Sequence, residues 1–149
     1  MEIVISRADA TSRVVQELCD AQQAEMAERY GEDDIPVAVS PDIAFVLATS
    51  GDGEPLGCGG VQLLEPGVGE LKRMYVVPSH RGQGISRRLL RAVEALAVEQ
   101  GLKIMRLETG TRQPESVGLY TTSGYDRIPR FGQYTDWPLS LCFEKHLVP

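Results

Sequence analysis

A glycine-rich loop at residues 81–87 is the segment of this sequence best suited to bind an anion. It reads Arg-Gly-Gln-Gly-Ile-Ser-Arg, between an apolar run that ends at Val77 and a helical pattern that begins at Ile85. The first turn of a helix offers unpaired backbone N–H groups and a partial positive charge, and glycine lets a ligand approach them closely. Gly82 and Gly84 stand where this access is needed, so the loop predicts a phosphate cradle.

Basic side chains gather around this loop. Residues 71–93 contain six Lys or Arg and no acid, although the whole chain has a net charge of −6. Residues 1–71 hold fourteen acids and three basic residues, so the acidic charge is concentrated in the first half. The arginines nearest the predicted helix start are Arg81, Arg87, Arg88 and Arg91. Cations are unfavourable there, which predicts a bound anion, while the acidic half is compatible with a cationic substrate.

Length and composition limit the class of protein. A chain of 149 residues that is 42 % hydrophobic predicts a single domain, residues 1–149, with its own core. Three widely spaced cysteines and an N-terminus without an apolar segment predict a cytoplasmic protein with no membrane span. Two histidines and no Cys-x-x-Cys pair give no support for a metal site. The acidic balance argues against nucleic acid as the main partner.

The pattern of apolar and turn residues predicts an α+β fold. The predicted strands are residues 2–6, 43–49, 57–64, 69–77, 103–109, 125–130 and 139–146, and the predicted helices run between 12 and 31, over 85–100 and over 114–123. The early strands form an antiparallel meander, whereas residues 71–109 form a strand–helix–strand crossover. The sheet should therefore be mixed.

The spacing of the glycines excludes two nucleotide-binding loops. A Walker A loop needs Gly-Lys-Ser/Thr after the glycines, and a dinucleotide fingerprint needs a third glycine where this chain has Arg87. The patterns that are present are Val76-x-Pro78-x-x-Arg81-Gly82-x-Gly84-x-Ser86 and Gln113-x-x-Ser116-x-x-Leu119-Tyr120-x-x-x-Gly124-Tyr125. Together they resemble the GNAT superfamily of N-acetyltransferases. Ser86 stands where that family usually has Gly or Ala, and Gln113 and Ser116 stand where many members have Asn and Ala.

The resemblance implies a fold and a cofactor. The fold is a GNAT-like mixed, mostly antiparallel central sheet flanked by helices, with a β-α-β core that binds acetyl-CoA. The main chain of residues 74–76 would pair with the pantetheine arm, and residues 82–87 would donate N–H groups to the pyrophosphate. The implied cofactor-binding residues are Met74, Tyr75, Val76, Arg81, Gly82, Gln83, Gly84, Ile85, Ser86, Arg87, Gln113 and Ser116.

Acetyl transfer to an amine needs a neutral nitrogen and a proton for the leaving thiolate. Alternate residues from 70 to 76 share one face of the predicted strand, and Glu70 lies six residues before Val76. In histone acetyltransferases that resemble this motif, the general-base glutamate has that offset. Glu108, on the next strand, is the second candidate, and either carboxylate could instead pair with a neighbouring cation. By resemblance, Tyr120 would point toward the thioester sulfur and protonate the thiolate.

The acceptor is the least determined part of the prediction. The candidate substrate residues are Glu25, Arg29, Tyr30, Arg73, Glu108, Phe131 and Tyr134. The aromatic residues would suit an apolar amine, the acids a second ammonium group, and the arginines a carboxylate. The implied function is transfer of acetyl from acetyl-CoA to the primary amine of a small molecule, such as an amino acid or a polyamine. The alternatives are a non-catalytic acyl-CoA-binding sensor and a peptide or protein N-acetyltransferase. The resemblance is also compatible with a homodimer.

Overall fold

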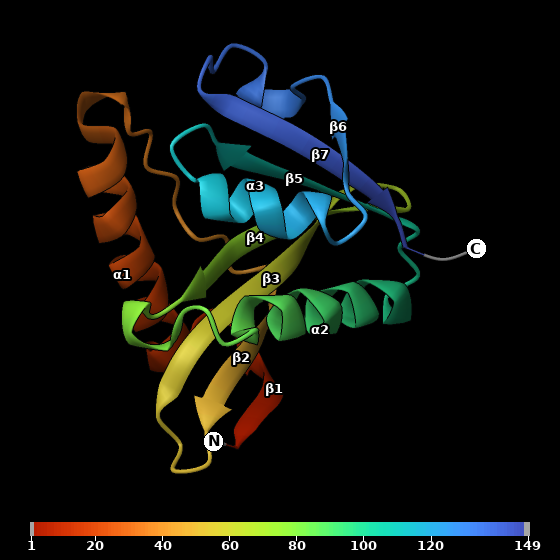
Figure 1. The fold of residues 1–149 in the computed structure, drawn as a ribbon. Coiled ribbons are helices and arrows are strands. Elements are labelled where there is room, and N and C mark those ends of the chain that lie inside the picture. The colour runs from red at the N-terminus through yellow and green to blue at the C-terminus, as the bar shows by residue number, and fades with distance from the viewer. Residues whose placement is uncertain (1, 148–149) are drawn as a thin grey trace.

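A seven-stranded sheet organises residues 2–147, the part of the chain that this computed structural model describes (Figure 1). The strand order is β1-β2-β3-β4-β5-β7-β6, and the parallel pair among them is β4 with β5. The strands are β1 (Ile3–Asp9), β2 (Ala44–Ser50), β3 (Pro55–Glu65), β4 (Val68–Val76), β5 (Ile104–Gly110), β6 (Asp126–Ile128) and β7 (Ser140–His146). The predicted antiparallel meander and the β-α-β crossover are both confirmed.

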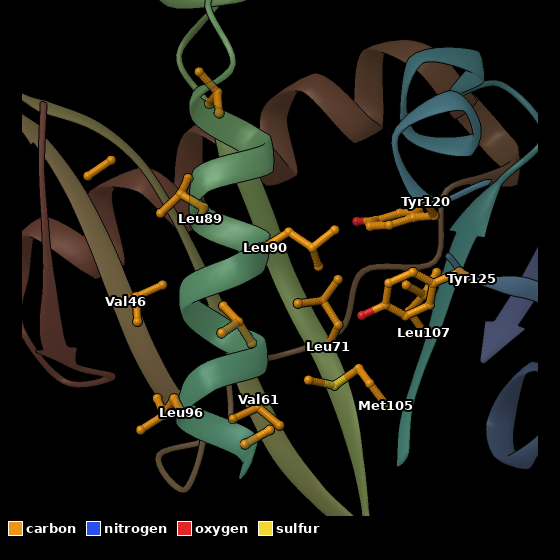
Figure 2. Close-up of a cluster of buried hydrophobic side chains, with 14 of the residues drawn as sticks. Val46, Val61, Leu71, Leu89, Leu90, Leu96, Met105, Leu107, Tyr120 and Tyr125 are labelled. Carbon is orange, nitrogen blue, oxygen red and sulfur yellow. The ribbon is translucent and has the colours of Figure 1, made fainter. Parts of the chain in front are cut away.

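The helices cover both faces of this sheet. They are α1 (Arg13–Tyr30), α2 (Ile85–Glu99) and α3 (Pro114–Thr121), with short 3₁₀ turns η1 (Gly31–Asp33), η2 (Pro78–His80) and η3 (Gly132–Tyr134). Side chains of α2 and α3 share one apolar cluster (Figure 2), whereas α1 packs in a second cluster on the opposite face. The apolar positions predicted for α2 are all buried: Ile85, Leu89, Leu90, Val93, Leu96 and Ala97. The predicted mixed α+β fold is confirmed, although β6 is only three residues long.

An extra residue in the middle of β4 reverses the direction of its side chains. Cys58 of β3 is opposite Tyr75 and Gly60 is opposite Lys72, so two residues of β4 face the single residue between them. Arg73, within this bulge, has φ +57°, a left-handed conformation that is rare for a residue with a Cβ. Consequently Leu71 and Val76 both pack in the cluster beneath α2, although they are an odd number of residues apart.

The bulge corrects one prediction. The sequence pattern placed residues 70, 72, 74 and 76 on a common face of the strand. In the structure, Glu70 and Lys72 lie on one face, while Met74 and Val76 lie with Leu71 on the face covered by α2. Simple alternation fails here because a bulge shifts the phase of a strand by one residue.

The parallel pairing of β4 with β5 is short. It covers three residue pairs and ends where Glu70 is opposite Arg106, while β5 continues to Gly110 along β7. Beyond Glu70, therefore, the edge of β4 that faces β5 has no strand partner among the described residues. This unpaired edge ends near the loop that begins α2. As for membranes, none of the helices within residues 2–147 combines the length and the apolar character needed to cross one.

Candidate functional site

The start of α2 forms an open cradle of backbone groups. Gly82 and Gly84 both have φ near +80°, and a Cβ on either would meet no atom within 4 Å. Gly84 is the N-cap of α2, and among the described residues no side chain caps this end and no acid lies in its first turn. The orphan N–H groups and the helix dipole are therefore available to an anion.

The arginines around the cradle are held by contacts within the protein. Arg81 donates from Nε to the carbonyl of Val76 at 2.9 Å and pairs with Glu25 at 2.7 Å. Arg87 donates to the hydroxyls of Thr122 and Ser123, both at 3.0 Å, and Arg88 donates to the carbonyl of Ile3. The side chains of these three arginines therefore contact several different elements of the fold. Arg87 is distinctive because its contacts in the described structure are neutral hydroxyls.

A cavity of about 650 Å³ opens between β4 and β5, where their pairing has ended. Its walls come from α1, the 32–43 loop, β4, β5, α3 and the segment before β7. Of the sequence-predicted residues, those on its walls are Tyr30, Arg73, Met74, Glu108, Gln113, Ser116, Tyr120 and Tyr134. Tyr75 and Val76 are buried beside α1 and α2 respectively, and the side chain of Ile85 lies in the core. Met74 thus connects the cavity to the strand end that leads to the cradle.

Tyr120 presents a hydroxyl without a protein partner at the wall of this cavity. The side chain is only 5 % exposed, yet its hydroxyl makes no hydrogen bond with the residues described. Figure 2 shows the hydroxyl directed toward Leu90 of α2, across the space between α2 and α3. Burial, with a smaller contribution from the charge of Glu108, raises the pKa of Tyr120 well above its usual value. The phenol therefore keeps its proton at neutral pH and can donate it.

The hydroxyl of the neighbouring Tyr125, unlike that of Tyr120, has a hydrogen-bond partner within the protein. Its ring makes an edge-to-face contact with that of Tyr120, with centroids 5.8 Å apart. Its hydroxyl donates to Glu94 at 2.7 Å, and Lys145 also pairs with that carboxylate. Two buried tyrosines thus lie side by side, one satisfied within the protein and one available to a ligand.

Glu108 is a carboxylate on the cavity wall that makes no ion pair with the described residues. It accepts a hydrogen bond from the Ser140 hydroxyl at 2.6 Å, and no Lys or Arg of residues 2–147 pairs with it. Burial raises the pKa of Glu108, the Ser140 bond lowers it, the charge of Glu70 raises it and the charge of Lys72 lowers it, with a net shift upward. A carboxylate with these properties can accept and release a proton nearer to neutral pH than an exposed one.

Glu70 is not among the residues that line the cavity, and it belongs to a buried polar network. Its carboxylate accepts hydrogen bonds from the Tyr134 hydroxyl at 2.5 Å and from the Lys72 ammonium at 3.1 Å. Both of these partners line the cavity, and the Lys72 ammonium also donates to the Tyr134 hydroxyl at 3.1 Å. Glu70 therefore reaches the cavity through Tyr134 and Lys72. Burial, followed by the charge of Glu70, raises the pKa of Tyr134, which keeps this proton in the network.

Tyr30, the last residue of α1, connects this helix through hydrogen bonds to the loop between β5 and α3. Its hydroxyl donates to the side-chain carbonyl of Gln113 at 3.1 Å and accepts from the backbone N–H of Arg112 at 3.3 Å. Gln113 also accepts from the N–H of Gly110. A Cβ at Gly110 would lie 1.6 Å from the Tyr30 hydroxyl, so only glycine fits there. The carbonyl of Gln113 is thus already engaged within the protein.

Three predicted acceptor residues lie off the cavity wall. Glu25 pairs with Arg29 at 3.1 Å and with Arg81, and Arg29 also pairs with Glu115 of α3. This chain of ion pairs joins α1 to α3 and to the cradle loop. Phe131 packs edge-to-face on Tyr134, with centroids 5.4 Å apart. These side chains hold the walls in place, and none of the three is among the residues that line the cavity.

Several cavity residues were missed by the sequence patterns. Gln22 and Thr109 line the cavity and carry buried oxygens, Oε1 and Oγ1, without a partner in the described structure. Gln22 donates from Nε2 to the carbonyl of Met74 at 2.9 Å. Trp137 stacks edge-to-face on Tyr134. No local pattern distinguishes these residues, because the fold brings them together from distant segments.

Comparisons with known proteins agree with this geometry. Residues 12–125 match the model of the Acetyltransferase (GNAT) family. The IAA acetyltransferase of Azospirillum brasilense is 44 % identical over 116 residues, which cover 76 % of this chain and 74 % of that protein. The putative acyl-CoA N-acyltransferase of Klebsiella pneumoniae is 35 % identical, with a TM-score of 0.86 over 98 % of both chains. A GNAT family acetyltransferase of Elizabethkingia anophelis, solved with acetyl-CoA bound, shares the fold at 18 % identity, with a TM-score of 0.72 over 97 % of both chains.

The two buried carboxylates should respond in opposite ways to removal of their charge. Folding raises the pKa of Glu108, so its ionised form destabilises the native state as the pH rises above the unfolded value of about 4.5. Glu108→Gln should therefore be more stable than the wild type at pH 7, with a gap that closes near pH 4. Glu70→Gln leaves the Lys72 ammonium without its counter-charge and should lose about 2 kcal/mol at pH 7.

Urea unfolding at pH 7 and pH 4 measures both effects. Each substitution replaces one carboxylate by its isosteric amide, so each variant is the matched control of the other. A loss of stability for Glu108→Gln at pH 7 would contradict the assignment of an unpaired carboxylate at the cavity wall.

Proposed function

The chain belongs to the GNAT acetyltransferase family, and on this premise we propose that it transfers the acetyl group of acetyl-CoA directly to the primary amine of a small molecule. Acetyl-CoA, the co-substrate of this family, supplies a thioester whose acetyl group moves to the amine and whose thiolate leaves. The cradle of Gly82 and Gly84 suits the pyrophosphate, since it offers backbone N–H groups with open space in front of them. We assign the pantetheine arm to the edge of β4 from Met74 to Val76, which has no strand partner toward β5 among the described residues and whose Met74 and Val76 carbonyls accept from the Gln22 and Arg81 side chains.

The observation that carries the proposal is the unpartnered hydroxyl of Tyr120. A buried phenol normally finds a hydrogen-bond partner inside the protein, as Tyr125 does with Glu94. Tyr120 lacks such a partner and borders the cavity, in the helix that follows the Gln113 loop. Its raised pKa keeps it protonated at neutral pH, so a proton is in place when the thiolate leaves, although the upward shift by itself makes the phenol a weaker donor.

The second proton transfer removes a proton from the acceptor amine, and Glu108 is the candidate base for it. An alkylamine is protonated at pH 7 and must lose a proton before it can attack a carbonyl carbon. Glu108 borders the cavity, makes no ion pair within residues 2–147 and has a raised pKa despite the nearby charge of Lys72, so we propose it as the base. Glu70, the first candidate from the sequence, becomes the second in this proposal, because its carboxylate oxygens are engaged by Lys72 and Tyr134. A proton from the cavity could reach it through Tyr134 or Lys72.

The shape of the cavity supports a small acceptor. Its outer part is bounded by the 32–43 loop and by the segment that carries Tyr134 and Trp137, and its volume is about 650 Å³. That volume lies in the range of small-molecule sites. The aromatic rings of Tyr30, Tyr134 and Trp137 provide apolar wall, and Glu108 provides negative charge for an ammonium group.

Two glycine substitutions, one at each end of α2, test the cradle. Gly84→Glu places a negative side chain in the cradle and should abolish acetyl-CoA binding, because the pyrophosphate is repelled. Gly101→Glu is the matched control, since Gly101 also has φ near +80° and open space, but lies just beyond the C-terminal end of α2. Isothermal titration with acetyl-CoA measures both variants. Equal loss in both variants, or binding retained by Gly84→Glu, would place the cofactor elsewhere.

The proton donor can be tested with the adjacent pair of tyrosines. Tyr120→Phe should lower kcat by about 100-fold or more, while acetyl-CoA binding stays unchanged, because only the proton for the thiolate is removed. Tyr125→Phe removes an equally buried hydroxyl and should leave kcat close to the wild type. Turnover is measured as CoA release with a panel of small primary amines. If Tyr120→Phe keeps full kcat with any acceptor, Tyr120 is not the acid.

A further inference from the structure

Arg73 is a cation on the cavity wall that makes no ion pair with an acid of residues 2–147. The neighbouring Lys72 differs, because its ammonium lies 3.1 Å from the Glu70 carboxylate. The Arg73 guanidinium donates a hydrogen bond to the carbonyl of Val37, in the loop that bounds the cavity. A guanidinium carries five N–H donors, so several of them remain for a ligand.

The bulge in β4 turns the side chain of Arg73 toward the cavity. In a regular strand, consecutive side chains point to opposite faces of the sheet. Here Lys72 and Arg73 both line the cavity, since the extra residue of the bulge leaves two neighbours on one face. Arg73 also borders a second recess, whose walls include residues of α1 and the 36–39 segment. Its side chain is therefore on the side of the sheet that α1 covers.

The backbone of the bulge holds Arg73 in a strained conformation. Its φ of +57° is unfavourable for any residue with a Cβ, and glycine would adopt it without strain. Two hydrogen bonds maintain the bulge, one from the S–H of Cys58 to the Arg73 carbonyl at 3.4 Å and one from Gln22 to the Met74 carbonyl at 2.9 Å. Strained residues are typical of functional sites. The combination of strain, a cavity and a free cation indicates a ligand for this side chain.

Opposite charges line the two strands that separate at the cavity. The pairing of β4 with β5 ends at Glu70 and Arg106, and Arg73 follows on β4 while Glu108 follows on β5. One wall therefore offers a guanidinium and the other a carboxylate. A guanidinium binds a carboxylate through two parallel N–H···O bonds. A small molecule with both an amine and a carboxylate matches the two walls.

The other acids of the cavity wall are less suited to hold a second ammonium group. Asp33 pairs with Arg112 at 2.9 Å, and Asp34 accepts a hydrogen bond from Gln23 at 2.9 Å. Glu32 is exposed at the outer part of the cavity. None of these three acids combines burial with a free carboxylate. The wall described here thus favours an acceptor with a carboxylate over a polyamine.

We propose that the acceptor is an amino acid, whose carboxylate is bound by Arg73 while its amine lies at Glu108. This inference rests on the proposed function, because it names the acceptor of that reaction. Binding of the carboxylate can nevertheless be measured without turnover. Arg73 is a specificity-determining residue in this account, and it takes no part in the proton transfers.

Pairs of compounds that differ only in the carboxylate test the proposal. The common amino acids are titrated into the protein in the presence of CoA, and each is compared with the amine that lacks its carboxylate, such as phenylalanine with phenethylamine and lysine with cadaverine. Isothermal titration should show at least one amino acid that binds about 100-fold more tightly than its matching amine. The same ratio is expected in kcat/KM for CoA release from acetyl-CoA. Binding of the amines alone, equal binding of both members of every pair, or no binding of any amino acid would overturn the inference.

Arg73→Gly removes the guanidinium and suits the left-handed backbone, so the bulge should persist. We expect kcat/KM for the amino acid to fall about 100-fold, mainly through KM, with kcat/KM for the matching amine and the affinity for acetyl-CoA unchanged. Arg73→Lys keeps the charge without the planar fork and should lose less. Urea unfolding should show that Arg73→Gly is at least as stable as the wild type.

The outcomes separate this inference from the proposed function. An equal loss for both members of a pair in Arg73→Gly would mean that Arg73 acts through the fold, and the inference would fail. Release of CoA with amines but without preference for a carboxylate would leave the proposed function standing and remove the inference. Binding of an amino acid that depends on Arg73 but gives no CoA release would do the reverse.

Discussion

The separation of β4 from β5 is the feature on which the rest of this structure depends. Two parallel strands that stay paired have no room between them, and here the pairing stops after three residue pairs. The bulge at Arg73 then turns the second half of β4, so that Met74 and Val76 face α2 while the strand edge stays unpaired. The cavity, the open edge and the approach to the cradle all follow from this one departure from regular sheet geometry.

The polar groups around the cavity divide into those that hold its walls and those that are left for a ligand. Glu70, Lys72 and Tyr134 satisfy one another, and the ion pairs of Arg29 with Glu25 and Glu115 join α1 to α3 across the site. The buried Gln22 Oε1 and Thr109 Oγ1 atoms on the cavity wall have no such partner in the described structure. Because unpaired buried polar atoms are costly, their gathering at one cavity is most simply explained by a bound substrate.

The sequence predicted the elements well because its local signals are strong there. The apolar period of α2 and the glycines that begin it need no tertiary information, and the meander and the crossover followed from the turns and from the alternation of strand and helix patterns. The position of β7 between β5 and β6 was not predicted. The bulge could not be predicted, since Arg73 adopts a positive φ that its residue type does not indicate. The contacts of Glu25 were also beyond reach, because Arg81 is 56 positions away. Long-range pairing decides whether a charged side chain lines a cavity or supports its wall.

The most direct measurement is hydrogen exchange of the backbone amides with and without acetyl-CoA. If the cofactor lies along the open edge of β4 and on the cradle, exchange should slow at residues 74–76 and 82–87 and stay unchanged in β1. Slowed exchange confined to other segments, or no change at the cradle, would contradict the account that the separation of β4 and β5 exists to hold this cofactor.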